Sequence, residues 1–187
     1  MPTNWSPIIE ACKRQDPAAQ EQIYRGCYAG MIKVCLRYAR GQADTASALY
    51  NQAMLKVIGN IRQYSGKGAF EGWVRSIVVN TCIDHCRSKS GFSPDELHEA
   101  NADLFPVIPE TYNRISSREI MALIHELPGN TALVFNLFAM EGYKHDEIGR
   151  ILGISAGTSK WHLNEARKLL KQKLDHLIKK ENLANAI

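Results

Sequence analysis

The strongest candidate for chemistry is the segment 82–86, Cys-Ile-Asp-His-Cys, where two thiols, a carboxyl and an imidazole are close in sequence. On a helix, Cys82 and Cys86 would lie one turn apart, whereas His85 would point elsewhere. Zinc requires four convergent ligands, and the other three cysteines are distant in the sequence: Cys12, Cys27 and Cys35. We interpret all five as reduced structural cysteines and predict neither a metal nor another cofactor.

We find no Gly-x-Ser-x-Gly pattern of a hydrolase nucleophile. The chain has no glycine-rich phosphate loop of the nucleotide-hydrolase type. Its six histidines are dispersed and have no evident nucleophile as a partner. These observations favour a binding protein over an enzyme.

Residues 144–170 contain the most informative pattern. Residues 145–152 predict a short helix, residues 153–155 a tight turn and residues 156–167 a second helix, with Gly153 free to adopt a positive φ. The apolar side chains expected between the two helices are Ile148, Leu152, Ile154, Leu163 and Ala166. Such a helix-turn-helix presents the start of its second helix to the DNA major groove. An ordinary helical hairpin with a glycine turn is the alternative.

The second helix carries the candidate DNA contacts. Its N-terminal N–H groups can face a phosphate, and Arg167 and Lys168 can clamp the backbone. Trp161 would either contact a thymine methyl group or pack on the preceding helix. The base-reading candidates are Thr158, Ser159, Lys160, Trp161, His162 and Asn164.

Apolar residues recur at helical spacing on both sides of a proline-rich, acidic middle segment, and alternating strand patterns are absent. We therefore predict an all-α protein: one helical domain over residues 1–90, a linker over 91–115, and a second helical domain over 116–187. Expected helices begin at Ser6-Pro7, Pro17 (capped by Asp16), Asp44, Phe70, Ser116 (in a capping box with Glu119), Thr131, His145 and Ala156, followed by a long basic helix to about Lys180.

Charge is unevenly distributed along the chain. Residues 1–87 carry 11 Lys and Arg against 6 Asp and Glu, whereas residues 88–115 carry 2 against 5. Basic blocks attract phosphate backbones, although a modest excess also suits a merely solvated surface. The N-terminus lacks a basic start followed by an apolar run, and no segment is apolar enough to span a membrane, so we expect a cytoplasmic protein.

Both halves resemble one family. In the C-terminal half the matching positions are Leu127-Pro128, Val134-Phe135, Glu141-Gly142-Tyr143, Glu147-Ile148, Leu152-Gly153-Ile154-Ser155, Gly157-Thr158, Lys160 and Ala166-Arg167. In the N-terminal half they are Leu55-Lys56-Val57, the glycine loop before Phe70, Trp73-Val74, Val79-Asn80 and Asp84-His85-Cys86-Arg87. These positions resemble the two DNA-binding domains of extracytoplasmic-function sigma factors, which initiate bacterial transcription.

The resemblance implies core RNA polymerase and promoter DNA as partners, with the second helix of residues 145–167 on the minus-thirty-five element. It also implies that the loop over residues 65–68 and the next helix capture the melted minus-ten strand, a task that needs a base pocket with basic and aromatic groups. Asn80 would lie at this strand, Lys67, Gly68 and Phe70 in or beside the loop, and Arg62, Arg75 and Arg87 near phosphates. Plain core packing is the alternative for Phe70 and the favoured interpretation for Trp73.

The family also implies that the third helix binds polymerase, through Ala48, Leu49, Gln52 and Lys56. Members usually carry an acidic residue and a Gln-Glu pair here, where this chain has Ala48, Asn51 and Gln52. Missing carboxylates would remove charge complementarity that directs docking. A sigma-like DNA-binding regulator that does not engage polymerase is therefore the alternative, and a module acting only through protein partners is a third. An anti-sigma protein is a further partner that the resemblance allows.

Overall fold

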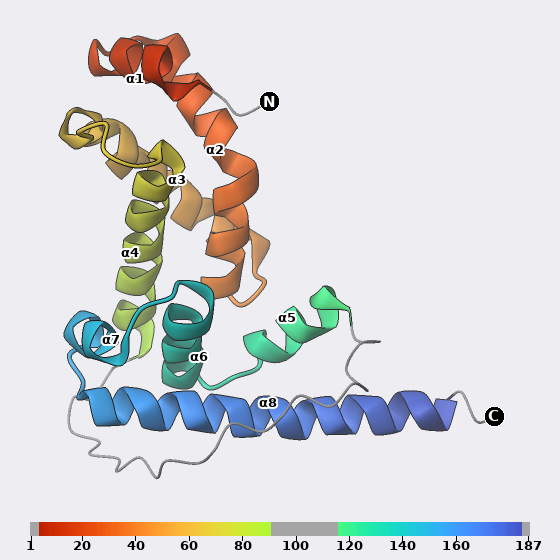
Figure 1. Cartoon of the computed structure of the whole chain (residues 1–187). Coiled ribbons are helices and arrows are strands. Elements are labelled where there is room, and N and C mark those ends of the chain that lie inside the picture. The colour runs from red at the N-terminus through yellow and green to blue at the C-terminus, as the bar shows by residue number, and fades with distance from the viewer. Residues whose placement is uncertain (1–3, 91–115, 185–187) are drawn as a thin grey trace. The chain divides into compact units, whose positions relative to one another are not determined.

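The computed structural model describes residues 4–90 and 116–184, and every regular element in these two stretches is a helix. The predicted all-α class is therefore confirmed. The chain divides into two compact units, Met1–Cys86 and Arg87–Ile187 (Figure 1). The predicted linker, residues 91–115, lies outside the described residues.

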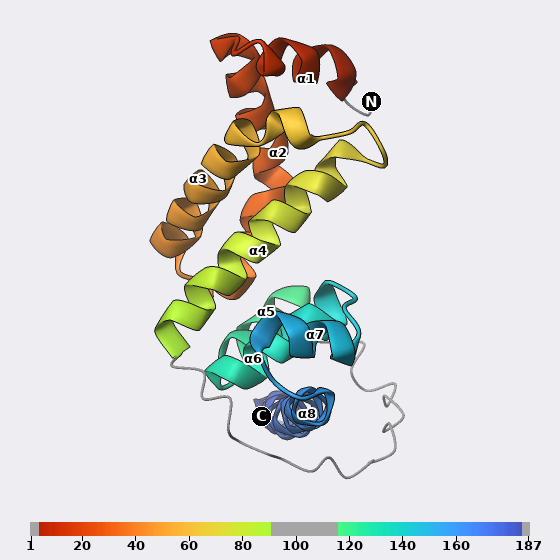
Figure 2. The ribbon, with the colours of Figure 1, turned by 90° about the vertical axis from the view of Figure 1, so that its left-hand side faces the viewer.

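Four helices form the first unit. They are α1 (Trp5–Lys13), α2 (Pro17–Tyr38), α3 (Ala43–Gly59) and α4 (Phe70–Ser90), with a short 3-10 turn, η1, at Ile61–Gln63. In both views of the ribbon α2, α3 and α4 lie side by side, and α1 crosses the end of α2 (Figures 1 and 2). The loop between η1 and α4 therefore lies at the same end of the bundle as α1.

The bounds of α2 follow from its sequence. Asp16 caps the helix, with its Oδ1 accepting a hydrogen bond from the N–H of Ala18 at 2.8 Å, and Pro17 occupies the first turn, where its missing N–H costs nothing. Beyond Tyr38 the chain reverses through Arg40 (φ 54°) and Gly41 (φ 78°). The apolar residues that recur at helical spacing along α2 are all buried: Ile23, Cys27, Met31, Val34, Cys35 and Tyr38.

The third expected helix is shorter than its periodicity suggests. The apolar spacing of residues 44–64 predicts a helix to about Tyr64, but α3 ends at Gly59, and the Asn60 side chain donates to the carbonyl of Lys56 at 2.8 Å. Glycine and asparagine are weak helix formers, and an asparagine side chain competes for backbone groups. The η1 turn that follows still carries Ile61 into the core, where it is 3% exposed.

The second unit is built on one long helix. It contains α5 (Ser117–His125), α6 (Gly129–Phe135), a π-helical turn η3 (Asn136–Met140), α7 (His145–Leu152) and α8 (Ala156–Ala184). Figure 2 looks along α8 and shows α5, α6 and α7 on the same side of it. Fully buried side chains at their junction include Leu127, Val134, Leu137 and Ile148.

Two local predictions for this unit have different outcomes. The capping box is confirmed, because Ser116 Oγ accepts from the N–H of Glu119 while the Glu119 carboxylate accepts from the N–H of Ser116. The prediction of a separate helix after residue 167 is wrong, because α8 runs unbroken from Ala156 to Ala184. No glycine or proline interrupts residues 158–184, so nothing in the sequence ends the helix.

Candidate nucleic-acid interface

The turn between α7 and α8 has helix-turn-helix geometry. Gly153 adopts the left-handed conformation (φ 71°, ψ 33°), and its N–H donates to the carbonyl of Gly149 at 2.8 Å. Ser155 then caps α8, since its Oγ accepts from the N–H of Thr158 at 2.9 Å. The positive φ predicted for Gly153 at the turn is confirmed.

Gly149 was not singled out by the sequence, yet it sets the separation of the two helices. A Cβ at this position would lie 2.7 Å from the Ile154 carbonyl oxygen, a backbone atom that cannot move aside. The turn therefore packs directly on the α7 backbone. Of the predicted seam, Ile148, Leu152, Leu163 and Ala166 are buried, and Ile154 is half-buried.

The prediction that the chain lacks a Gly-x-Ser-x-Gly pattern is wrong, because Gly153-x-Ser155-x-Gly157 in the same turn has this spacing. That pattern identifies a nucleophile only between a strand and a helix. Here it follows helix α7, and the Ser155 hydroxyl is engaged by Thr158, whose Oγ1 lies 2.9 Å away. Ser155 is thus a helix cap.

The candidate DNA-contacting side chains differ in exposure. Lys160 and Lys168 are exposed, whereas Trp161, Asn164 and Arg167 are half-buried. Lys160 lies in the second turn of α8, where residues of a recognition helix meet base edges. All five side chains keep some exposed surface.

Three other candidates point into the unit. Thr158, Ser159 and His162 are 5%, 0% and 6% exposed. Ser159 Oγ lies 2.9 Å from His145 Nδ1, which joins α8 to α7, and His162 Nδ1 lies 3.0 Å from Thr131 Oγ1, which joins α8 to α6. Their assignment to base contact is corrected, because Ser159 and His162 join α8 to other helices and Thr158 is engaged with Ser155 at the N-cap of α8.

Positive charge collects around His145. The imidazole ring of His145 stacks on the phenyl ring of Phe138, with centroids 4.6 Å apart. The Arg167 guanidinium lies over the Phe138 ring, 5.9 Å from its centroid. Burial lowers the pKa of His145, and the charges of Lys160 and Arg167 lower it further. Burial also lowers the pKa of Arg167. Lys160 and Arg167 are seven residues apart on α8 and therefore lie on the same side of that helix, where two cations suit an anionic ligand.

The loop before α4 is fastened by an aromatic cluster consisting of Trp5, Tyr64, Phe70 and Trp73. The Tyr64 hydroxyl donates to the carbonyl of Gly68 at 2.7 Å, and Gly66 and Gly68 both have positive φ. Phe70 is 3% exposed, so its assignment as a DNA contact is corrected: it packs against Tyr64 at 5.3 Å and Trp73 at 5.9 Å. Lys67 and Gly68 are exposed.

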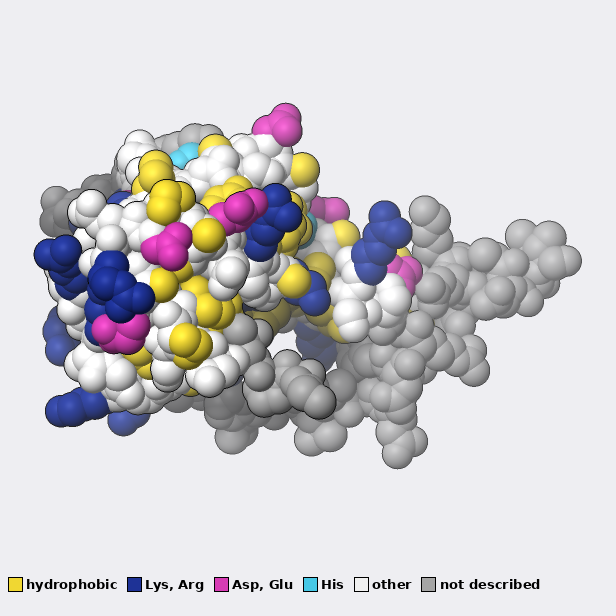
Figure 3. Space-filling view, turned by 90° about the horizontal axis from the view of Figure 1, so that it is seen from above, with side chains coloured by type: hydrophobic (Ala, Val, Ile, Leu, Met, Phe, Trp, Pro, Cys, Tyr) yellow, Lys and Arg dark blue, Asp and Glu magenta, His cyan; other side chains and the backbone are white. Residues whose placement is uncertain are grey.

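One polar face of α4 continues from this loop. Asn80 and Arg87 are exposed and seven residues apart, so they lie on the same side of the helix, while Arg75 is half-buried. Arg62 is exposed on η1. Figure 3 shows Lys and Arg side chains on the face that it draws, interspersed with hydrophobic and acidic ones.

The α3 residues predicted to bind polymerase fall on two sides of the helix. Ala48 and Gln52 are exposed and Lys56 is half-buried, whereas Leu49 is 2% exposed and belongs to the core. The assignment of Leu49 is therefore corrected. Sequence reasoning omitted Leu55, which is 73% exposed and lies one turn beyond Gln52. Its i, i+7 spacing from Ala48 is the signal that could have found it.

The other residues of the first unit that the sequence singled out contact neighbouring side chains of the same unit. Asn51 Oδ1 accepts from the Tyr24 hydroxyl at 2.7 Å, and Lys56 lies 3.5 Å from the Asp84 carboxylate. Burial, with a smaller contribution from Glu71, raises the pKa of Cys27 to about 12. Within residues 4–90 and 116–184 no cluster of His, Cys, Asp and Glu could hold a metal ion.

No helix in the described part of the chain is long and apolar enough to cross a membrane.

Comparison with known families assigns both units. The model for sigma-70 region 2 matches residues 23–92, and the model for sigma-70 region 4 matches residues 117–170. The chain therefore belongs to the sigma-70 family of transcription initiation factors, in its extracytoplasmic-function (ECF) group.

Individual proteins that are similar to this chain are sigma factors as well. The ECF RNA polymerase sigma factor SigM of Mycobacterium tuberculosis is 25% identical over 170 residues, which cover 91% of this chain and 84% of that protein. The RNA polymerase sigma-H factor of Pseudomonas aeruginosa is 22% identical over 185 residues, covering 92% and 94%. A crystal structure of the sigma factor RpoE with the anti-sigma factor NepR from Bartonella quintana aligns at 15% identity and a TM-score of 0.49, covering 82% of this chain and 94% of that one, a likeness too weak to argue from.

Proposed function

We propose that this sigma factor recruits core RNA polymerase to promoters by reading the minus-thirty-five duplex with the first turns of α8 and the melted minus-ten strand with the loop before α4. The observation that carries the proposal is the helix-turn-helix, in which Lys160 is exposed on the recognition helix and lies on the same side of it as Arg167. It acts by binding, in the cytoplasm, and not as an enzyme.

At the minus-thirty-five element, we assign base contact to Lys160, Trp161 and Asn164. Lysine can donate to guanine, asparagine pairs with adenine, and an aromatic ring can contact a thymine methyl group. Arg167 and Lys168 follow one to two turns later, where a helix leaving the groove meets the phosphate backbone.

At the minus-ten element, we assign strand contact to Asn80, with Lys67, Arg62, Arg75 and Arg87 near phosphates. The exposure of Asn80 and Arg87 on one face of α4 supports this assignment. Gly68 contributes its backbone, because its positive φ and exposed position allow a nucleotide to approach closely.

For polymerase, we assign the exposed row Ala48, Gln52 and Leu55 of α3, with Lys56 at its border. The row offers apolar contact in place of the charge complementarity typical of the family. Removal of a large apolar side chain from water contributes about 1.5–3 kcal/mol, so Leu55 can offset part of the missing electrostatic attraction. An anti-sigma protein stays a predicted partner.

The test is run-off transcription with purified core polymerase on a pool of genomic promoter fragments, with and without this protein. New discrete transcripts support the proposal and identify the promoters. The missing carboxylates on α3 favour a second candidate, a DNA-binding regulator that does not engage polymerase. Absence of transcripts, together with failure to co-purify with core polymerase, would reject the proposal in favour of that regulator.

A further inference from the structure

The N-terminal helix α1 contacts the predicted minus-ten loop from outside it. Trp5 opens α1, and its indole Nε1 donates to the carboxylate of Glu71 in the first turn of α4. At the other end of α1, the Lys13 carbonyl accepts from Arg62 Nη2 at 3.3 Å. Both ends of α1 are thus joined to residues that flank the loop.

The Trp5 ring also forms part of the aromatic cluster. Its centroid lies 5.1 Å from that of Phe70, which in turn lies 5.3 Å from Tyr64. Tyr64 donates to the carbonyl of Gly68 inside the loop. A continuous series of contacts therefore connects α1 to the loop backbone.

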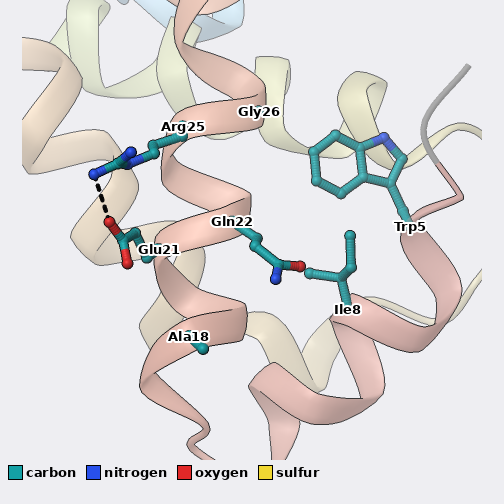
Figure 4. A pocket seen from close by; sticks show the side chains of 7 residues that line it. All are labelled: Trp5, Ile8, Ala18, Glu21, Gln22, Arg25 and Gly26. Carbon is teal, nitrogen blue, oxygen red and sulfur yellow. Dashed lines mark ion pairs between the residues drawn. The ribbon is translucent and has the colours of Figure 1, made fainter. Parts of the chain in front are cut away.

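The far side of the indole rests on α2. Figure 4 shows the Trp5 ring turned toward Gly26 across a groove of about 490 Å³ between α1 and α2, with Ile8 and Gln22 in the same groove. A Cβ on Gly26 would lie 2.6 Å from Trp5 Cη2, closer than atoms can approach. The absence of a side chain at Gly26 is what lets the indole take this position.

We infer that Trp5 is a positioning residue for capture of the minus-ten strand: α2, through Gly26, sets the indole against Glu71 and Phe70 and so holds the loop in the conformation that receives the base. Trp5 is 9% exposed and needs no contact with DNA for this role. A pocket for a flipped base binds best when its walls are already ordered, because ordering them on binding lowers affinity. The inference rests on the proposed function.

Gly26→Ala tests it without altering α1, the loop or α4. The new methyl group forces the indole from its place, and the loop should lose order. Gly30→Ala is the matched control, since Gly30 lies one turn further along α2 and a Cβ there meets no atom within 4 Å. Trp5→Ala and Trp5→Phe form a second pair, in which phenylalanine restores the ring contact with Phe70 without the donor to Glu71.

The measurement is the affinity of the reconstituted holoenzyme for a single-stranded minus-ten oligonucleotide carrying a fluorescent base, divided by its affinity for a minus-thirty-five duplex. Thermal unfolding identifies variants that do not fold. We expect the ratio to fall about tenfold, or about 1.4 kcal/mol, in Gly26→Ala and Trp5→Ala, to recover partly in Trp5→Phe, and to stay unchanged in Gly30→Ala.

An unchanged ratio in folded Gly26→Ala and Trp5→Ala, or an equal fall in Gly30→Ala, would overturn the inference. If Gly26→Ala does not fold, the comparison of Trp5→Ala with Trp5→Phe decides: equal ratios in these two variants and the wild type reject a positioning role. Failure of the wild-type holoenzyme to bind the strand would instead count against the proposed function, so the two failures are distinguishable.

Discussion

Individual side chains on α8 serve two purposes within a few residues of one another. Lys160 projects outward, while its neighbours Ser159 and His162 make buried hydrogen bonds to α7 and α6. Because the inward residues fix the rotation of the helix, they determine which residues can face DNA. The outward set is small, and each member can be tested separately.

Lys160→Ala should weaken binding to a duplex minus-thirty-five element by about 1–3 kcal/mol if the ammonium contacts a base, and the loss should depend on the base at one position. Fluorescence anisotropy on a series of single-base variants measures both effects. Lys171→Ala, which removes an exposed lysine three turns further along α8, is the control. A uniform loss across all sequences would make Lys160 a phosphate contact instead.

Asn80→Ala should leave binding to the minus-thirty-five duplex unchanged and impair opening of the minus-ten element, because the exposed amide lies on the face of α4 assigned to the melted strand. A fluorescent base in the minus-ten element reports opening in the holoenzyme. Ser76→Ala changes the exposed residue one turn earlier and serves as the comparison. Equal opening by Asn80→Ala and wild type would sink the assignment.

His145 should make the stability of the second unit depend on pH. Its pKa in the folded protein lies below the value of about 6.5 expected in the unfolded chain, so at pH below about 6.5 the unfolded state binds a proton that the folded state excludes. The free energy of unfolding should therefore fall as pH decreases through this range. Urea titrations at several pH values, for wild type and His145→Gln, would contradict this if both lost stability equally on acidification.

At the scale of elements, the helix-turn-helix is held by close approach of backbones as well as by apolar side chains. Gly149 lets the turn pack on α7, and Gly153 lets the chain reverse within a single residue. Each glycine is required for a different reason, steric in the first case and conformational in the second. The angle between α7 and α8, and hence the presentation of Lys160, depends on both.

Gly149→Ala should destabilise this unit by about 1–3 kcal/mol, because overpacking against the Ile154 carbonyl exceeds the gain in helix propensity. Gly129→Ala in α6 is the matched control, since a Cβ there meets nothing within 4 Å, and its effect should stay within about 1 kcal/mol. Chemical unfolding measures both. Similar stability of the two variants would show that the turn can relax away from α7.

At the scale of the whole molecule, each unit carries one of the two proposed DNA-binding surfaces, and the first unit also carries the exposed row on α3. Residues 1–22, which include α1, lie outside the matched family regions. Even so, α1 is hydrogen-bonded to Glu71 and Arg62, which flank the loop proposed to bind DNA. The α3 row is the feature proposed to contact polymerase, and it can be tested directly.

Leu55→Ala should weaken the complex with core polymerase by about 1.5–3 kcal/mol if the leucine becomes fully buried there, while the stability of the free protein stays unchanged because the side chain is 73% exposed. Competition against a labelled sigma factor measures the affinity. Ile120→Ala, which removes a 40% exposed apolar side chain from the second unit, is the control. Equal affinities of both variants would place the polymerase contact elsewhere.

Sequence patterns alone determined the helical class, most helix starts and the family. Apolar spacing located the inward face of α2, and short-range chemistry located its N-cap at Asp16 and the capping box at Ser116, because caps depend only on residues within one turn. Gly153 was predictable for the same reason. The unbroken α8 was missed because periodicity does not mark where one helix becomes two.

Tertiary structure decided which side chains face outward. Ser159 and His162 are polar and look like DNA contacts in sequence, but packing rotates α8 so that both meet partners on other helices. Leu49 and Leu55 are the same residue type on one helix, and only packing against α2 separates the buried one from the exposed one. The rotation of a helix about its axis is set by its neighbours, and contacts such as Trp5 on Gly26 join residues that no local pattern relates.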